Sequence, residues 1–332
     1  MELPGYVQIE PVGQCNLRCQ MCAIQFRRDG PADGPPAFMS FETFTRVLDQ
    51  FTGVRELHLQ GLGEPMMHPR FFDMVAYAAG KGIVVTTNSN LTLLTPRRAE
   101  RCVTSGLHSL HVSIDGATAE TYERIRARAR FDQVVRNVRL VVDARRRLGG
   151  RLPHLHMVTV VMRQNLAELP EIVRLAHRLS LESLFVQHLC HDFGESTLPA
   201  QYGPMREFVQ DESLLEEDLE RVEHYFSRAR AVARELGFPV RLPRARPRRH
   251  APGTPGPQRC DWPWRGAYLD YRGYAMPCCM VSTADRIHFG NMAEQGVERI
   301  WNGTAYQAFR DRLASDVPPE ICASCSVYHG IF

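Results

Sequence analysis

Three cysteines near the N-terminus carry the most specific chemical signal in this sequence. Cys15, Cys19 and Cys22 have the spacing C-x3-C-x2-C, and the next cysteine along the chain is Cys102. Iron–sulfur clusters are normally held by four thiolates. Three thiolates on one short loop would hold three irons of a 4Fe–4S cube and leave the fourth iron open to a second molecule. The alternative is a zinc knuckle, which requires another nearby cysteine pair or a histidine, and none follows the loop.

The cysteine spacing resembles the signature of the radical S-adenosylmethionine (SAM) superfamily. The resemblance implies that the open iron chelates the amino and carboxylate groups of SAM, and that an electron from the cluster cleaves SAM to a 5′-deoxyadenosyl radical. One predicted strand later, Gly63 and Glu64 stand in the run Gly-Leu-Gly-Glu-Pro. This run resembles the family's loop for the SAM amino group, where glycine permits a close backbone approach.

Three further residues resemble SAM contacts of that family. Asn88 ends the third predicted strand, Ser113 ends the fourth, and Met21 precedes the last cysteine of the loop. The resemblance implies polar contacts from Asn88 and Ser113 to SAM, and packing of Met21 against adenine at a position that is often aromatic. Asn and Ser are also ordinary turn residues, so a simple turn is the alternative reading of both strand ends.

The C-terminal region contains a second set of cysteines. Cys260, Gly273 and Cys278 give C-x12-G-x4-C, and Cys322 and Cys325 form a C-x2-C pair near the end. This pattern resembles the Twitch version of the SPASM extension, and the resemblance implies an auxiliary 4Fe–4S cluster on these four cysteines. A structural zinc on the same thiolates is the alternative. Cys279, directly after Cys278, leaves open which of the two is the ligand.

Apolar runs of strand type alternate with helix-type segments up to about residue 240, which predicts parallel βαβ units. Six such units favour an α/β fold, a partial (βα)6 TIM-like barrel with its active site at the carboxyl ends of the strands. We divide the chain into a barrel (1–240), a Pro/Arg-rich linker or loop (241–258) and a small Twitch-type iron–sulfur domain (259–332). The predicted strands are Tyr6–Val12, Glu56–Gln60, Ile83–Thr87, Leu107–Ile114, Leu155–Met162 and Ser183–Leu189. The first predicted helix begins at Phe41. The other predicted helices span Pro69–Ala79, Pro96–Ser105, Phe131–Leu148, Leu166–Leu179 and Asp211–Leu236.

The composition excludes several classes of function. The chain has 332 residues, 44% of them hydrophobic, and a net charge of only +3, which gives no reason to expect nucleic-acid binding. No stretch has the roughly 20 apolar residues of a membrane span, and the N-terminus lacks the features of a signal peptide. We therefore expect a cytoplasmic protein without membrane contact, in which ten cysteines serve metal binding or catalysis.

Cys190 is the candidate for direct catalysis. It ends the sixth predicted strand, so we expect its thiol at the mouth of the barrel. A thiol there can give a hydrogen atom to a substrate carbon radical from the opposite face, which inverts the carbon. The neighbouring His188, Asp192 and Glu195 are candidate substrate contacts, the two carboxylates for ammonium groups. A buried structural role for Cys190 is the alternative.

The first predicted strand begins by residue 6, so we expect no leader-peptide recognition domain before the barrel. The chain resembles members that tailor aminoglycosides and aminocyclitols, with a flavodoxin- or ferredoxin-type reductant. The main hypothesis is an epimerase that inverts a carbinol carbon with Cys190 as hydrogen donor. The alternatives are a dehydrogenase that makes a ketone and passes an electron to the auxiliary cluster, a peptide-modifying maturase, and a non-catalytic iron–sulfur electron carrier.

Overall fold

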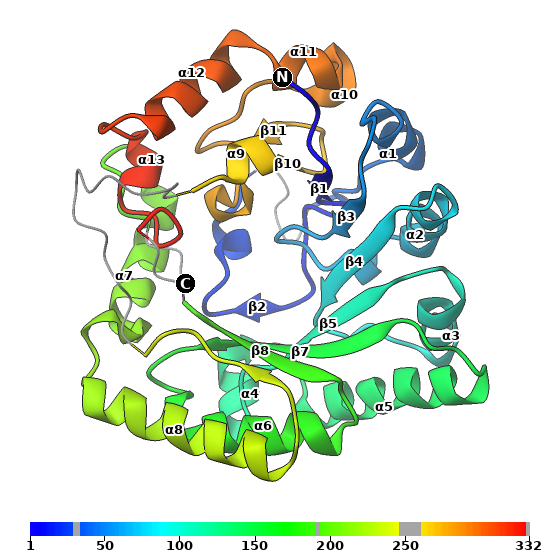
Figure 1. Ribbon diagram of the computed structural model, residues 1–332, viewed down its shortest axis with the longest axis vertical. Helices are drawn as coiled ribbons and strands as arrows, with labels where there is room; N and C mark the ends of the chain where they lie inside the picture. Colours follow the sequence, from blue (N-terminus) through cyan, green and yellow to red (C-terminus); the bar gives the residue numbers. More distant parts are fainter. Residues whose placement is uncertain (29–33, 190–192, 246–259, 330–332) are drawn as a thin grey trace.

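The computed structural model describes residues 1–28, 34–189, 193–245 and 260–329. Its main feature is a curved nine-stranded sheet in the order β11-β10-β1-β3-β4-β5-β7-β8-β9. Every neighbouring pair from β10 to β9 is parallel, whereas β11 runs antiparallel to β10. The strands are β1 (Tyr6–Ile9), β3 (Glu56–Leu59), β4 (Val84–Ser89), β5 (Ser109–Ser113), β7 (His154–Val161), β8 (Ser183–His188), β9 (Val240–Arg241), β10 (Gly266–Leu269) and β11 (Ala275–Met276). This is the predicted α/β architecture, an open TIM-like barrel (Figure 1).

Helices cover the outer side of the barrel sheet (Figure 1). Their starts follow local chemistry: the Ser40 hydroxyl accepts from Thr43 N at 3.0 Å and caps α1, and Thr95 caps α3 in the same way. The barrel helices are α1 (Phe41–Leu48), α2 (Phe71–Gly80), α3 (Pro96–Thr104), α4 (Ala119–Ile125), α5 (Phe131–Arg147), α6 (Leu169–Arg178), α7 (Gly203–Glu212) and α8 (Leu219–Glu235). The later helices are α9 (Trp262–Arg265), α10 (Met292–Gln295), α11 (Val297–Trp301), α12 (Thr304–Ala314) and α13 (Glu320–Ala323).

The two faces of the sheet differ in chemistry. Outward-facing residues such as Leu57 and Leu59 are fully buried against the helices. On the inner face polar side chains contact one another across strands: His58 Nδ1 lies 2.7 Å from Thr86 Oγ1, and the ring of His111 stacks on that of His156. Small TIM barrels normally fill this space with packed aliphatic layers. The polar lining here instead suits a barrel that holds a polar ligand.

The region after residue 259 joins the barrel sheet directly. Strand β10 pairs in parallel with β1 in the register Tyr6↔Gly266, and β11 adds an outer antiparallel strand. Helices α10 to α12 lie beside this edge, where Trp301 is fully buried and donates to the carbonyl of Glu2 at 2.9 Å. The predicted boundary between barrel and C-terminal domain therefore crosses a shared sheet. Most of the predicted linker, residues 246–258, lies outside the described residues.

The six predicted barrel strands are all present, with ends shifted by a few residues. The single helix predicted over Asp211–Leu236 is wrong. Helix α7 ends at Glu212, Ser213 is extended, and Asp218 starts α8 by accepting from Glu220 N at 3.0 Å. Ser and Asp side chains compete for backbone hydrogen bonds in this way, which ends one helix and begins another. None of the described helices has the length and apolar character needed to cross a membrane.

Candidate iron–sulfur and SAM site

The cysteine loop lies at the carboxyl end of β1, on the inner side of the barrel. Its middle part, β2 (Arg18–Cys19), pairs with β6 (Arg126–Ala127) in a small antiparallel ribbon. The backbone N–H of Cys22 then donates to the Cys19 carbonyl at 3.1 Å, which turns the loop back on itself. Cys15, Cys19 and Cys22 all line one cavity of about 220 Å³. The structure therefore brings the three sequence-predicted thiols together.

Burial raises the pKa of all three thiols. For Cys22 the pKa rises to about 12, because burial and the nearby Cys19 both disfavour the thiolate. The pKa values of Cys15 and Cys19 also lie above the ordinary range, again mainly because of burial. A thiolate here needs a positive partner, which iron supplies on binding. The donor set thus fits a cationic iron–sulfur core better than it fits free thiolates.

The Gly-Glu-Pro loop at the end of β3 packs against the cysteine loop. A Cβ atom on Gly63 would stand 1.9 Å from the Val12 carbonyl oxygen, so only glycine fits this backbone contact. Glu64 N donates to the carbonyl of Gln14 at 2.9 Å. The buried Glu64 carboxylate accepts from Ser89 Oγ at 2.7 Å and from Asn90 N at 2.9 Å. The carboxylate thereby fixes the loop to β4.

The cavity that contains the three thiols also contains the other predicted SAM contacts. Gly63, Glu64, Asn88 and Ser113 line it from the ends of β3, β4 and β5, and Met21 lines it from the cysteine loop. These ends meet because parallel strands point the same way and their carboxyl termini share one edge of the barrel. All five predicted cofactor-binding residues therefore share one site with the cysteines.

A buried ionic triad lies beneath this site. The Glu10 carboxylate accepts from Leu62 N at 2.9 Å and from Arg27 Nη1 at 2.8 Å, and Arg27 Nη2 lies 3.9 Å from Asp270 Oδ2. The side chains of Glu10, Arg27 and Asp270 have no exposed surface. Because Asp270 follows β10, the triad ties both loops of the site to the C-terminal region. This triad is not predicted from the sequence. Its one sequence signal is an acidic residue at the end of a buried strand.

The four predicted auxiliary cysteines also come together. Cys260, Cys322 and Cys325 pack around Phe309, Leu313 and Tyr328. Burial raises the pKa of the Cys278 thiol well above its ordinary range, and the charges of Cys279, Cys325, Cys322 and Cys260 raise it further. Cys278 therefore lies amid the other four thiols.

Gly273 of the predicted motif forms the turn between β10 and β11 with φ of +92°, a conformation that favours glycine.

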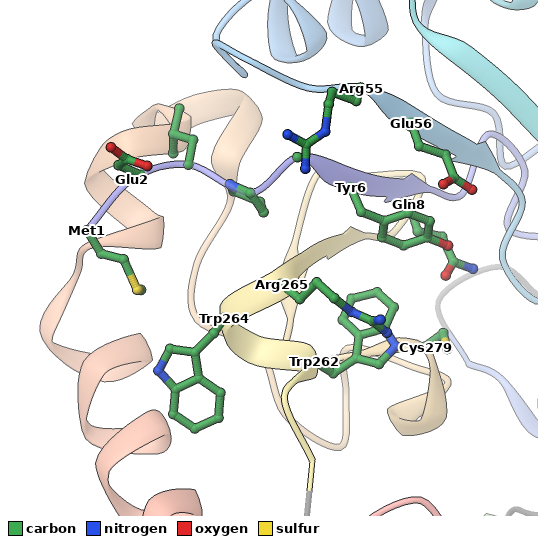
Figure 2. A pocket seen from close by; sticks show the side chains of 13 residues that line it. Met1, Glu2, Tyr6, Gln8, Arg55, Glu56, Trp262, Trp264, Arg265 and Cys279 are labelled. Carbon is green, nitrogen blue, oxygen red and sulfur yellow. The ribbon is translucent and has the colours of Figure 1, made fainter. Parts of the chain in front are cut away.

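Cys279 lies near the same cysteine set. Burial raises the pKa of its thiol, and the charges of Cys325 and Cys260 raise it as well. Its thiol forms part of the wall of a separate cavity of about 750 Å³, together with Tyr6, Trp262 and Arg265 (Figure 2). The rings of Tyr6 and Trp262 meet edge to face there, with centroids 5.7 Å apart. Cys278 has all four other thiols around it and stays the predicted auxiliary ligand.

Among the described residues no group of three or more His, Cys, Asp or Glu side chains is arranged to hold a single metal ion. A 4Fe–4S cube takes each thiolate on a separate iron, so its ligands need not converge on one point. Cys102, by contrast, is fully buried in α3 and belongs to the hydrophobic core.

The structure gives two of the predicted substrate contacts other partners. His188 lies on the outward face of β8, where its ring stacks on Phe226 of α8 and its Nε2 lies 2.8 Å from the Arg244 carbonyl oxygen. The Glu195 carboxylate is buried and accepts from Arg286 Nε at 2.7 Å, so it has a cation already. Side chains alternate along a strand, and Gln187 rather than His188 lines the cavity. The predictions for Cys190 and Asp192 fall outside the described residues.

The signature of the Radical SAM superfamily matches residues 9–176, which include the cysteine loop, the Gly-Glu-Pro loop and the ends of β4 and β5. The chain belongs to the radical SAM superfamily. A second signature, the SPASM iron–sulfur cluster-binding domain, matches residues 260–326. The protein is therefore a radical SAM enzyme that uses SAM, with a 4Fe–4S cluster and auxiliary iron–sulfur binding in its C-terminal region.

Relatives match the chain over nearly its whole length. The tungsten-containing aldehyde ferredoxin oxidoreductase cofactor-modifying protein of Pyrococcus furiosus is 24% identical over 97% of this chain and 87% of its own. The PqqA peptide cyclase of Gluconobacter oxydans is 26% identical over 97% of this chain and 82% of its own. The crystal structure of Streptococcus suis SuiB bound to precursor peptide SuiA superposes with a TM-score of 0.68 at 14% identity, covering 99% of this chain and 71% of SuiB. The last likeness concerns the fold alone.

Proposed function

We propose that this radical SAM enzyme is a maturase that oxidises a peptide-derived precursor of a cofactor. In this proposal Cys15, Cys19 and Cys22 hold the first cluster, and Cys260, Cys278, Cys322 and Cys325 hold an auxiliary cluster. The observation that carries the radical chemistry is the single cavity shared by the first three thiols, Gly63 and the ends of β4 and β5. The substrate class is supported by the full-length relatives, one of which modifies a cofactor and another a peptide.

The cluster and SAM, when bound, supply a 5′-deoxyadenosyl radical that removes a hydrogen atom from a substrate carbon. The residues of this chain position that chemistry. Gly63 lets the Gly-Glu-Pro loop pack directly against the carbonyls of Val12 and Gln14 before the cysteine loop, because it has no side chain. Asn88 and Ser113 offer an amide and a hydroxyl at the adjacent strand ends, suited to the carboxylate and ribose of SAM.

The C-terminal region completes the proposal. Radical SAM enzymes need a one-electron reductant, and we propose a carrier of flavodoxin or ferredoxin type. An auxiliary cluster on Cys260, Cys278, Cys322 and Cys325 would accept the electron that remains when a substrate radical is oxidised. The buried pair of Glu195 and Arg286 supports this arrangement, because it fixes the segment after β8 to the auxiliary region.

The test uses the reconstituted holoenzyme with SAM, a reductant and synthetic precursor peptides encoded beside its gene, followed by mass spectrometry. The proposal predicts a peptide product that has lost two hydrogen atoms, formed together with 5′-deoxyadenosine. Cys19→Ala should abolish both products. Cys102→Ala is the matched control, a buried cysteine outside both sets, and should keep them.

An aminoglycoside epimerase with Cys190 as hydrogen donor stays a prediction that the full-length relatives do not favour. The same assay in deuterium oxide with a panel of aminoglycosides distinguishes the two. Incorporation of a single deuteron at a carbinol carbon would establish the epimerase, and loss of two hydrogen atoms from the sugar would establish the dehydrogenase. Either result without any peptide product would overturn the maturase proposal.

A further inference from the structure

A buried guanidinium lies beside one of the three loop thiols. Arg126 starts β6, and the pairing of β6 with β2 sets it opposite Cys19. Its Nη1 donates to Cys19 Sγ at a distance of 3.8 Å. The side chain of Arg126 is 10% exposed, so solvent screens its charge only weakly. Arg126 also lines the cavity that contains the three cysteines.

A buried carboxylate holds this guanidinium in place. Asp115 Oδ2 lies 2.6 Å from Arg126 Nε in an ion pair, and the Asp115 side chain has no exposed surface. The other oxygen, Oδ1, accepts from Val160 N at 2.8 Å, which fixes the carboxylate between β5 and β7. An arginine guanidinium stays protonated in proteins, and the Asp115 carboxylate beside it favours that charged form further. Arg126 therefore stays charged.

We propose that Arg126 and Asp115 set the reduction potential of the cluster on the N-terminal loop. The guanidinium stabilises the reduced state of the cluster through its hydrogen bond to Cys19. The carboxylate orients the guanidinium and offsets part of its positive charge. This inference rests on the proposed role of Cys19 as a cluster ligand. Both residues are positioning residues, because they act on the cluster through the thiolate.

The physical reason lies in the charge that reduction adds. One external electron enters the cluster without making or breaking a covalent bond, and the negative charge of the cluster grows by one. Cluster potentials depend on net charge, on hydrogen bonds to the sulfurs and on solvent exposure. A buried cation that donates to a ligand sulfur favours the reduced state on the first two counts. A buried anion next to that cation has the opposite effect.

The experiment is a redox titration of the anaerobic holoenzyme followed by electron paramagnetic resonance, without SAM. The N-terminal cluster is recognised in a parallel sample as the signal that shifts when SAM is added. Arg126→Gln should lower the ratio of reduced to oxidised N-terminal cluster about tenfold at a fixed potential, which is about 59 mV for one electron. Asp115→Asn should raise the ratio, and Arg126→Lys should keep it near the wild-type value. Arg130→Gln, which removes a cation that is 77% exposed from the same segment, is the matched control and should change nothing.

The outcomes separate this inference from simpler roles. If Arg126 only binds SAM, the Arg126→Gln variant keeps the wild-type potential without SAM and loses SAM affinity, which overturns the inference. If Arg126→Gln fails to retain iron, the Asp115→Asn variant tests the inference alone. An unchanged or lowered reduction potential of its N-terminal cluster overturns the inference. Iron content of Cys19→Ala tests the ligand assignment separately. A variant that kept all its iron would overturn the proposed ligand set and with it this inference.

Discussion

Replacing Arg27 by Met tests whether the buried triad holds the SAM site to the C-terminal region. The change leaves the Glu10 carboxylate buried without its cation, whereas Asp270 keeps Arg272 at 3.1 Å. Removing one partner of a buried ion pair costs about 3–5 kcal/mol, because the remaining charge cannot be hydrated. At roughly 2 °C per kcal/mol for a chain of this size, the melting temperature should fall by on the order of 5–10 °C.

Arg272→Met is the matched control. Arg272 Nη2 lies 3.1 Å from the same Asp270 oxygen, but its side chain is 36% exposed and Asp270 keeps the N–H groups of Arg272 and Tyr274, so its removal should cost only about 1–2 kcal/mol. Adding Glu10→Gln to Arg27→Met should recover part of the loss. Glutamine keeps an acceptor oxygen for the N–H groups of Leu62 and Gly63 without the buried charge.

The measurement is anaerobic thermal unfolding of the iron-loaded proteins by circular dichroism. Arg27→Met should also weaken SAM binding, because Glu10 then loses the cation that holds it under the Gly-Glu-Pro loop. Equal melting temperatures for Arg27→Met and Arg272→Met, or no recovery by Glu10→Gln, would refute the reasoning.

Three further predictions follow from single features. Gly63→Ala forces a Cβ against the Val12 carbonyl oxygen. It should weaken SAM binding about tenfold or more in equilibrium dialysis, with the iron content unchanged. An unaltered SAM affinity would contradict the close approach of the two loops. Burial and His111 lower the pKa of His58 to about 4, so the unfolded state binds more protons between pH 6.5 and pH 4. Stability should fall by about 3 kcal/mol as the pH drops through that window, and denaturant titrations of His58→Asn should lack this share of the pH dependence. Replacing Cys322 and Cys325 together by Ala should remove about four of about eight irons and stop multiple turnovers while SAM cleavage persists; a full iron complement would contradict the auxiliary assignment.

The barrel could be predicted from sequence because its signals are local. Each parallel strand is an apolar run between helices, and caps such as Ser40 and Thr95 mark where helices begin. The N-terminal cysteine loop could be recognised for the same reason, since Cys15, Cys19 and Cys22 are close in sequence. Strand β10 escaped prediction because nothing nearby in sequence indicates that it pairs with β1.

The residues around the site were harder to predict, because their partners are distant in sequence. Arg27 contacts Asp270, although most of the sequence lies between them. Arg126 contacts Cys19 only because the short strands β2 and β6 pair with each other. The position of His188 differs from the prediction for another reason. A strand alternates faces with every residue, so an error of one position exchanged Gln187 for His188.

The position of β1 in the sheet has a consequence for how the protein is made. This strand is synthesised before the other strands of the described sheet, yet it lies between β3 and β10, and β10 begins only at Gly266. Until that segment emerges, one edge of β1 has no strand partner, and closing such a long loop is slow. The cysteine loop directly follows β1, so its final shape depends on a strand that is synthesised long after it. We expect iron insertion to occur after translation. We also expect chains truncated before Gly266 to expose the unpaired edge of β1, which is prone to aggregation unless a chaperone binds it.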